Sequence, residues 1–214
     1  MTGRNPAPKR GYAGRSAEER RAERRERLLS AALELFGTRG YAATSIERLC
    51  TTAAVSTRNF YEEFTGREEL LTILHQRFNE RCSTALAEAY AAADAEGADL
   101  RTRVERAVRA YMGTAAADPR WARVAYVEVI GVSPELERHR LGWRERWEHT
   151  ISTVANDAVA RGEATDRDYR LTAIAVIGAV NNLAHHWSSR DRDIPADDIA
   201  AELTHLIVSS MMSP

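Results

Sequence analysis

The residues best suited to chemistry in this 214-residue chain lie at positions 56–61, in the segment STRNFY. Arginine and asparagine form paired hydrogen bonds with guanine and adenine edges in the major groove of DNA, and Arg58 and Asn59 are adjacent here. Hydroxyl and phenol groups contact phosphates or bases, and Thr57 and Tyr61 supply them. The pattern therefore indicates DNA readout. A short helix with an arginine and an asparagine on its face is also a common surface connection, so this segment alone leaves that alternative open.

Three predicted helix starts position this segment. Ser56 is a predicted N-cap, because a serine hydroxyl accepts a hydrogen bond from a free backbone N–H at a helix start. Residues 44–47 and 65–68 each pair a threonine with a glutamate three positions later, which is the capping-box pattern. A turn at 52–55 precedes a helix with room for about two turns. This order predicts a helix-turn-helix whose short second helix presents its first turn outward.

An amphipathic helix is predicted before this unit. Leu29, Ala32, Leu33 and Phe36 follow the i, i+3, i+4, i+7 spacing of a helix with one apolar face. Gly40 is suited to end that helix, because glycine adopts the left-handed conformation common just after a helix. The sequence therefore predicts three helices in close succession.

Residues 25–71 resemble the DNA-binding domain of the tetracycline-repressor (TetR) family of bacterial regulators. The matching pieces are RERLLSAALELF, GY, TSIERL, VSTRNFYEEF and REELL, in the family's order and spacing. The sequence departs at Ala54, where the family usually has glycine in the turn, at Cys50, where it has alanine, and at Arg67, where it often has lysine. The resemblance implies a transcriptional regulator that places the helix at 56–64 in the major groove.

Residue types and this resemblance together predict the DNA-contacting side chains. Arg58 and Asn59 are expected at base edges, and Thr57 at a base or a phosphate. Residues at helix starts and the remaining polar side chains suit backbone phosphates. The full predicted set is Arg25, Thr44, Ser45, Ser56, Thr57, Arg58, Asn59, Tyr61 and Arg67.

Charge is divided unevenly along the chain. Residues 1–67 carry 13 Lys+Arg and 8 Asp+Glu, a net of +5, whereas residues 68–214 carry 17 and 23, a net of −6, giving −1 in total. A basic first third on an acidic body suits one face that meets a polyanion. The arginines and glutamates at 18–27 interleave, which is also typical of a helix that is simply solvated.

Composition predicts an all-α protein, because helix-forming residues are abundant, prolines number only 6, and alternating β-branched runs are absent. We expect a basic, partly disordered arm at 1–19, a helix-turn-helix DNA-binding domain at 20–66, and a helical effector-binding and dimerisation domain at 67–214. The arm, with Arg4, Lys9, Arg10 and Arg15, either lies along a DNA groove or makes no contact.

The segment 170–180, RLTAIAVIGAV, is apolar almost all round. A helix that is hydrophobic on every side must be covered on every side, so we infer a partner chain; the alternative is a core helix of a monomer. The resemblance implies a four-helix dimer interface built from two C-terminal helices of each subunit. The predicted interface residues are Ile174, Ile177, Val180, Leu203, Leu206 and Ile207.

All 4 tryptophans lie beyond the predicted DNA-binding domain. A cavity lined by aromatic rings and a few polar groups is the usual site for an apolar ligand, although a tryptophan stripe is more often core, and Asn181 could equally lie at a dimer interface. His139, His149 and His205 are expected on the surface. The predicted pocket residues are Trp121, Tyr126, Trp143, Trp147, Asn181 and His185.

The sequence thus predicts a cytoplasmic homodimer that represses transcription from a palindromic double-stranded operator and is released by a small apolar or amphipathic effector. Effector binding is expected to swing the long helix 66–93 and change the spacing of the two reading helices. The alternative is an architectural DNA-binding protein without a ligand. The sequence has no catalytic motif, metal-ligand spacing, secretory signal or membrane-length apolar run, so we expect no enzyme, metal, cofactor or membrane partner. Cys50 and Cys82 are expected to be reduced, buried thiols.

Overall fold

The computed structural model describes residues 16–189 and 194–212, and every regular element within those ranges is helical. The all-α prediction is therefore confirmed. In chain order the elements are α1 (Ala17–Arg39), α2 (Ile46–Ala53), α3 (Thr57–Glu63), α4 (Arg67–Ala95), α5 (Leu100–Ala117), α6 (Pro119–Arg123), the π-helix η1 (Val124–Glu128), α7 (Pro134–Ala160), α8 (Arg170–Ser189) and α9 (Ala196–Met212).

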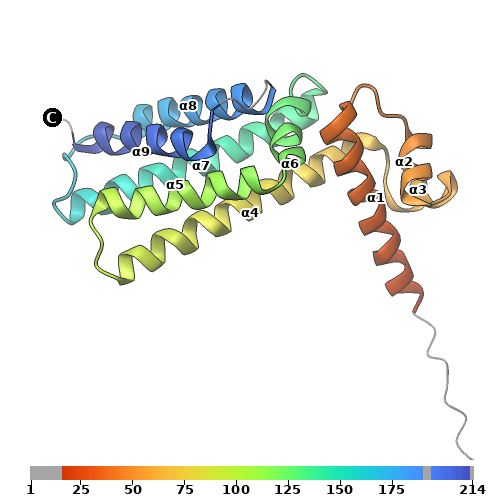
Figure 1. The fold of residues 1–214 in the computed structure, drawn as a ribbon, viewed down its shortest axis with the longest axis horizontal. Helices are drawn as coiled ribbons and strands as arrows, with labels where there is room; N and C mark the ends of the chain where they lie inside the picture. Colours follow the sequence, from red (N-terminus) through yellow and green to blue (C-terminus); the bar gives the residue numbers. More distant parts are fainter. Residues whose placement is uncertain (1–15, 190–193, 213–214) are drawn as a thin grey trace, which may run out of the picture.

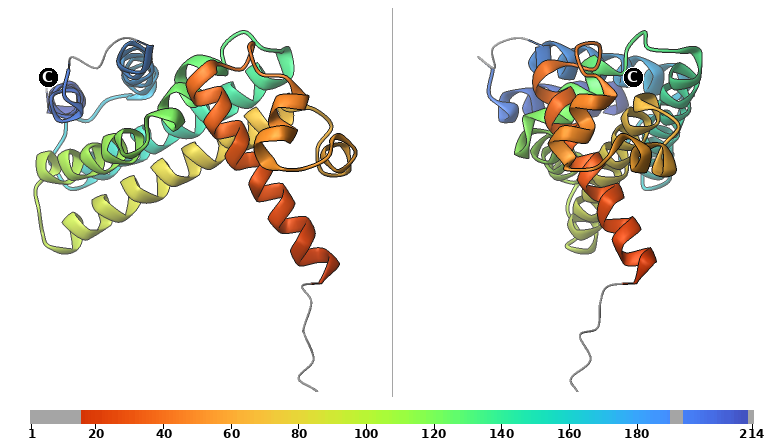
Figure 2. Two further views of the ribbon diagram at one scale, coloured as in Figure 1. Left: turned by 45° about the vertical axis from the view of Figure 1, so that its right-hand side comes forward. Right: turned by 90° about the vertical axis from the view of Figure 1, so that its right-hand side faces the viewer.

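The three N-terminal helices gather at one end of the molecule, and α4 runs from them into the C-terminal helices (Figure 1). Figure 2 shows the first turns of α1 projecting away from the rest. The long helix α4 belongs to both hydrophobic cores. Leu70, Leu71 and Leu74 pack into the N-terminal core, whereas Phe78 and Cys82 pack into the C-terminal one. A shift of α4 would therefore change the packing of both domains.

Two of the four predicted helix ends, Ser56 and Gly40, are confirmed. The Ser56 hydroxyl accepts a hydrogen bond from the Asn59 N–H at 3.2 Å, which caps α3. Asp99 caps α5 in the same way. Gly40 ends α1 with a φ of 94°. Ala54 ends α2 in the left-handed region, with a φ of 51°, so the turn keeps a conformation that favours glycine, at a cost on the order of 1 kcal/mol for an alanine.

Two predicted caps are wrong by one residue. The N-cap of α2 is Ser45, which accepts from the Arg48 N–H at 3.3 Å, because the Thr44 hydroxyl is buried and donates to the Gly40 carbonyl. The N-cap of α4 is Gly66, without a side-chain bond. Thr65 instead donates from its hydroxyl and its N–H to Glu69, so the glutamate that answers it lies one position later than the capping box requires.

The boundary expected between arm and first domain falls inside α1. Ser16 and Glu19 form a complete capping box, and the helix starts at Ala17. Residues 17–19 are therefore helical. The arm residues Arg4, Lys9, Arg10 and Arg15 lie outside the described residues.

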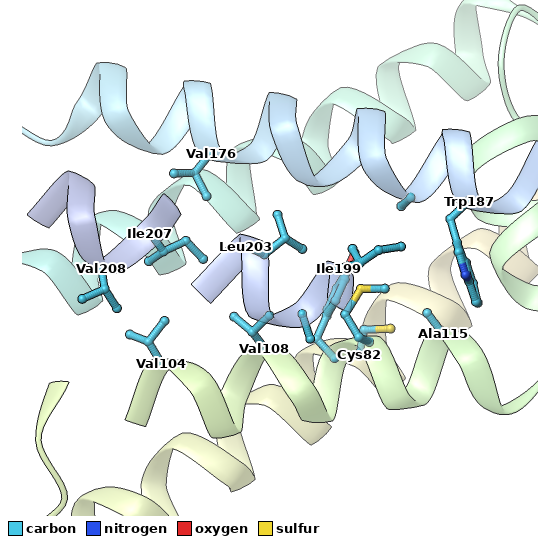
Figure 3. Packing of buried hydrophobic residues seen from close by; sticks show 14 of the residues in the cluster. Cys82, Val104, Val108, Ala115, Val176, Trp187, Ile199, Leu203, Ile207 and Val208 are labelled. Carbon is cyan, nitrogen blue, oxygen red and sulfur yellow. The ribbon is translucent and has the colours of Figure 1, made fainter. Parts of the chain in front are cut away.

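Helix α9 lies between α8 and α5 in the C-terminal core. Figure 3 shows Ile199, Leu203, Ile207 and Val208 of α9 between Val176 of α8 and the side chains of α5. Both cysteines are free and buried, as predicted, and burial raises the pKa of Cys82 to about 12.

The position of α9 corrects part of the predicted dimer interface. Ile177, Leu203 and Ile207 are buried within their own chain, and Val180 packs against the same core. The apolar face of α8 is thus covered largely by α6, η1, α7 and α9 of one chain. Of the predicted set, Ile174 remains exposed and Leu206 half-buried.

Candidate DNA-binding surface and effector pocket

Helix α3 presents a polar face because its apolar residues anchor it from behind. Phe60 and Phe64 are buried in the N-terminal core. Thr57, Arg58 and Tyr61 are exposed on the other face. The Arg58 side chain is 90% exposed, and its only ion pair among the described residues is with Glu62, one turn later, at 3.4 Å. An exposed i, i+4 pair of this kind is weak, so Arg58 is available to a DNA base or phosphate.

A buried carboxylate fixes the C-terminal end of α3 against α1. Glu63, whose side chain is 1% exposed, forms ion pairs with Arg21 at 3.0 Å and Arg24 at 3.1 Å. Burial by itself would raise the pKa of Glu63, but hydrogen bonds and charge from these two arginines outweigh it and lower the pKa. The interleaved charges of α1 are therefore partly structural. Sequence reasoning missed this role, because no spacing rule links residues about 40 positions apart.

Two arginines predicted to reach phosphates also form bonds within the DNA-binding domain. Arg25 donates to the Glu63 carbonyl at 2.9 Å and stacks over the Phe64 ring. Arg67 donates to the carbonyls of Tyr41 and Thr44 and stacks over the Tyr41 ring. Their backbone contacts commit part of each guanidinium to internal bonds.

The remaining predicted DNA contacts divide by exposure. Ser45 and Ser56 are exposed at the starts of α2 and α3, and Asn59 is half-buried beside them. Thr44 is buried and bonded to Gly40, so its hydroxyl is not presented to a phosphate. The structure thus brings Ser56, Thr57, Arg58, Asn59 and Tyr61 onto one short helix and its cap.

A cavity of about 90 Å³ lies between the helices of the C-terminal domain. Its walls come from α4, α5, η1, α7, α8 and α9. Of the predicted pocket residues, Tyr126, Trp143, Trp147 and Asn181 line it. Four residues expected at the dimer interface also line it, namely Ile177, Val180, Leu203 and Ile207. Residues that faced a partner in the prediction therefore face the inside of their own domain.

Two predicted pocket residues lie elsewhere. Trp121 packs between the two cores, with the Arg81 guanidinium 5.1 Å from its ring. His185 is half-buried on α8 but is not part of the cavity wall. Trp121 lies on α6, which contributes no residue to the cavity wall, and His185 lies one turn beyond the wall residue Asn181 on α8. The residues of a cavity wall cannot be assigned from sequence without knowing which helices pack together.

The cavity has polar wall groups that sequence reasoning missed. Asn79 of α4 accepts a hydrogen bond from the Trp147 indole N–H at 2.9 Å. Tyr111 and Tyr126 share a hydrogen bond between their hydroxyls, and burial raises the pKa of both. Arg140 and Arg144 complete the polar part. Asn79 lies one turn after His75 on α4, and this spacing alone is only a weak indication of a site. The two residues form part of the cavity wall because α7 packs against them.

His75 is a further wall residue, and its environment keeps it neutral. It is buried, and its ring centroid lies 5.2 Å from that of His139. Burial, together with the charges of His139 and Arg140, lowers the pKa of His75 to about 3. His139 was expected on the surface, but it is half-buried against His75, and burial lowers its pKa as well.

The π-helix η1 connects the cavity to the DNA-binding domain. Tyr126 is part of the cavity wall. Two residues later, Glu128 accepts a hydrogen bond from the Tyr41 N–H at 2.7 Å. Glu128 also pairs with Arg123 at 2.9 Å, and Arg123 donates to the Thr38 carbonyl. The end of α1 is therefore bonded directly to a cavity-lining element.

Helices α1 and α6 also approach closely at Gly37. A Cβ atom built on Gly37 would lie 2.4 Å from the Cβ of Arg120. Arg120 forms ion pairs with Glu34 of α1 and with Asp118, which caps α6. The absence of a side chain at Gly37 allows this contact between the domains.

A helix-turn-helix unit with an outward-facing polar helix, joined to a helical domain, defines a DNA-binding regulator. The comparisons with known proteins agree with this class. Residues 28–72 match the model of bacterial regulatory proteins of the tetR family, and residues 97–211 match that of the tetracyclin repressor-like C-terminal domain. The chain belongs to the TetR family of DNA-binding transcriptional regulators.

Curated relatives match over most of the chain. It is similar to the HTH-type transcriptional regulator EthR of Mycolicibacterium smegmatis, with 23% identity over 92% of this chain and 90% of EthR. It is also similar to the HTH-type transcriptional activator FasR of the same organism, with 24% identity over 83% of this chain and 78% of FasR.

Solved structures share the fold. A TetR-family regulator from Syntrophomonas wolfei matches with a TM-score of 0.74 and 21% identity, over 88% of this chain and 95% of that one. The regulator FadR from Bacillus subtilis, solved in complex with stearoyl-CoA, matches with a TM-score of 0.72 and 18% identity, over 87% and 98% of the two chains. Within the described residues of the present chain, the helices are too short or too polar to span a membrane.

Proposed function

We propose that this regulator is a dimeric repressor that binds a palindromic operator and is released by a small apolar or amphipathic effector in the C-terminal cavity. One observation carries the proposal. The cavity wall and the anchor of the DNA-binding domain belong to the same short element, with Tyr126 in the wall and Glu128 bonded to Tyr41. A ligand that displaces Tyr126 would also move the attachment point of the DNA-binding domain.

On the DNA side, α3 enters the major groove with Arg58 and Asn59 at base edges. Thr57 and Tyr61 contact a base or the backbone. Ser45 lies at the N-terminus of α2, where free backbone N–H groups favour a phosphate. Ser45, Thr57, Arg58 and Tyr61 are exposed, which supports their assignment. Asn59 is half-buried in the first turn of the same helix.

Dimerisation is assigned to the outer face of α8 and α9. Leu171 is 72% exposed and Ile174 is 42% exposed on α8, and Met212 of α9 is 58% exposed. Leu206 lies half-buried on α9. Exposed apolar side chains on two adjacent helices are typical of an interface. A two-fold dimer would place two α3 helices for a palindrome.

The effector acts through a difference in affinity between two states. The ligand must bind more tightly to the protein state in which the two α3 helices of the dimer do not fit DNA than to the state in which they do. Operator DNA must then weaken ligand binding by the same factor. The cavity of about 90 Å³ is narrow for a ligand of ten or more heavy atoms, so such a ligand would move the walls. This supports coupling through α4 and η1.

The experiment is selection of bound sequences from a random duplex pool at physiological salt, with the full chain. A two-fold palindrome would support a dimeric sequence-specific regulator. Failure to enrich any sequence, before and after refolding from denaturant to remove bound effector, would favour the architectural alternative. A reporter with the selected operator across or upstream of its promoter would then separate repression from activation, the role named for the relative FasR.

The oligomeric state tests the interface directly. Ile174→Asp places a charge on the exposed face of α8 and should halve the mass of the protein in solution. Ile130→Asp is a matched control, because Ile130 is similarly exposed but lies after η1. An unchanged mass for Ile174→Asp would exclude this face as the interface.

A further inference from the structure

The cavity in the C-terminal domain is polar at one end and apolar at the other. On α4, His75 contacts His139 of α7. Four residues later on α4, Asn79 bonds to Trp147, which also lies later on α7. The two helices therefore run in the same direction past the cavity. The charged wall groups on α7 are Arg140 and Arg144, and Ile151 follows two turns after Arg144. The cavity therefore has a defined axis.

A second, smaller cavity continues that axis. It measures about 60 Å³ and shares Leu86, Val108, Thr150, Ile151 and Ile207 with the first one. Apart from the shared Thr150 and from Tyr90, its wall consists of aliphatic side chains and the thioether of Met211. Because the two cavities have common walls, small side-chain movements would join them into one elongated apolar channel.

The polar end holds buried donors without partners. The indole Nε1 of Trp143 and the Nε of Arg144 are buried and have no hydrogen-bond partner in the described part of the chain. Trp143 is only 9% exposed, and both residues line the cavity. Buried donors in folded proteins are normally bonded, so these two call for an acceptor that the chain itself does not provide.

The charge at this end is positive. Arg140 and Arg144 line the cavity, and its wall includes no acidic residue among the described ones. Glu137 balances Arg140, with which it pairs at 2.9 Å. Among the described residues, no carboxylate lies within 4.0 Å of Arg144. The charge of Arg144 nevertheless helps to lower the pKa of Glu137, with a smaller effect than that of Arg140. His75, held neutral, adds no charge. A half-buried, unpaired guanidinium beside an unpartnered indole N–H favours an anion.

We propose that this cavity binds a linear amphipathic anion. A carboxylate or phosphate head group accepts hydrogen bonds from Arg144 and Trp143, and an alkyl chain runs past Leu86 and Ile151 into the second cavity. The assignment rests on the proposed function only in taking this cavity as the effector site. It goes further by specifying the charge of the head group and the direction of the tail.

Four ligands that share a ten-carbon chain test the head group: decanoate, decyl phosphate, 1-decanol and decylammonium. Binding to the full chain is followed without DNA, by calorimetry and by the fluorescence of the wall tryptophans. We expect at least one of the two anions to bind ten-fold or more tightly than 1-decanol, and decylammonium to bind most weakly. The stronger of the two anions identifies carboxylate or phosphate as the natural head group. Equal affinity for 1-decanol and both anions, or a preference for the cation, would overturn the proposal.

A substitution at Arg144 separates recognition from folding. Arg144→Gln should lower anion affinity about ten-fold and leave 1-decanol affinity unchanged, because the apolar channel is intact. Arg138→Gln on the same helix is the control, since Arg138 is exposed and pairs only with Glu135 among the described residues. Unchanged anion binding in Arg144→Gln, or equal loss of 1-decanol, would contradict the assignment.

The tail is tested at Val154, which lines the second cavity only. Val154→Phe should reduce the affinity for dodecanoate several-fold and leave that for hexanoate unchanged. Equal effects on both chain lengths would exclude the second cavity. Release of operator DNA is measured separately. An anion that binds but does not release DNA supports the anion site and contradicts the proposed effector role. Release by an uncharged compound alone supports the effector role and contradicts the anion site.

Discussion

The carboxylate of Glu128 accepts a hydrogen bond from the backbone N–H of Tyr41, across 87 positions of sequence. Glu128 ends the π-helix, and Tyr41 follows the glycine that ends α1. This bond attaches the helix-turn-helix unit to an element that also lines the cavity. The two domains are therefore connected by η1 as well as by the shared helix α4.

Replacing Glu128 with alanine should uncouple the two sites. The variant loses the acceptor for Tyr41 and the partner of Arg123, whereas Tyr126 stays in the cavity wall. We expect ligand affinity to change little, and the effect of ligand on operator affinity, typically about 1–3 kcal/mol in such systems, to fall towards zero. Operator titrations with and without ligand measure it. Glu135→Ala, at an exposed residue of α7, is the control; full coupling in Glu128→Ala would exclude this route.

Arg58→Ala should weaken specific operator binding by about 1–3 kcal/mol and relax preference at one base position. The reason is the loss of a bidentate base contact from an exposed, weakly paired guanidinium. Affinity for the operator and for single-base variants of it measures the effect. Arg138→Ala controls for net charge. A uniform loss on every sequence would reassign Arg58 to the phosphate backbone.

Glu63→Ala should destabilise the N-terminal domain by about 1–3 kcal/mol, because a buried charge cluster with Arg21 and Arg24 is broken. The loss in the free energy of unfolding is small for a buried charge because Arg21 is largely exposed and solvent weakens its ion pair. Urea unfolding followed by circular dichroism measures it. DNA binding should weaken equally on all sequences, since α3 is displaced as a unit. Glu62→Ala, one residue earlier and exposed, should change stability by less than about 0.5 kcal/mol.

Acid should destabilise the protein through His75. Its folded pKa of about 3 lies below the ordinary value of 6.5, so below pH 6.5 the unfolded chain binds a proton that the folded chain does not. The contribution of His75 to the free energy of unfolding is therefore fully present above about pH 6.5. It is lost as the pH falls towards 3, by up to about 1.4 kcal/mol per pH unit. Unfolding midpoints between pH 7 and 5 measure the slope. His75→Leu should flatten it, whereas His205→Leu, at an exposed residue, should not.

Local patterns predicted the parts of the fold that depend on neighbouring residues. Ser56 caps α3 and Gly40 ends α1 because each needs only its own backbone surroundings. The polar residues on the exposed face of α3 followed from the same local reasoning. The failures concern residues whose roles depend on packing between distant helices. Glu63 became a structural anchor through α1, and Ile177 faces the cavity because α9 covers α8.

The cavity shows the same limit. Trp143 and Trp147 were found from their type, whereas His75, Asn79 and Arg144 were missed because polar residues on long helices usually face solvent. Only the parallel course of α4 and α7 brings them together. The sequence contains no signal for that pairing, so the charge of the head-group end could be recognised only in three dimensions.

The π-helix has a consequence for how this regulator could have diverged from its relatives. A π-turn accommodates an extra residue in a helix, and each residue of an α-helix turns the chain by about 100°. Loss of one residue from η1 therefore restores an ordinary helical turn, keeps the register of the helix on either side, and changes the relative directions of Tyr126 and Glu128, which both lie inside η1. Under the coupling proposed above, deletion of a single codon here removes the response to ligand while preserving ligand binding and operator binding, and a single insertion creates it. Homologues with and without that codon would form natural pairs of inducible and constitutive DNA-binding proteins.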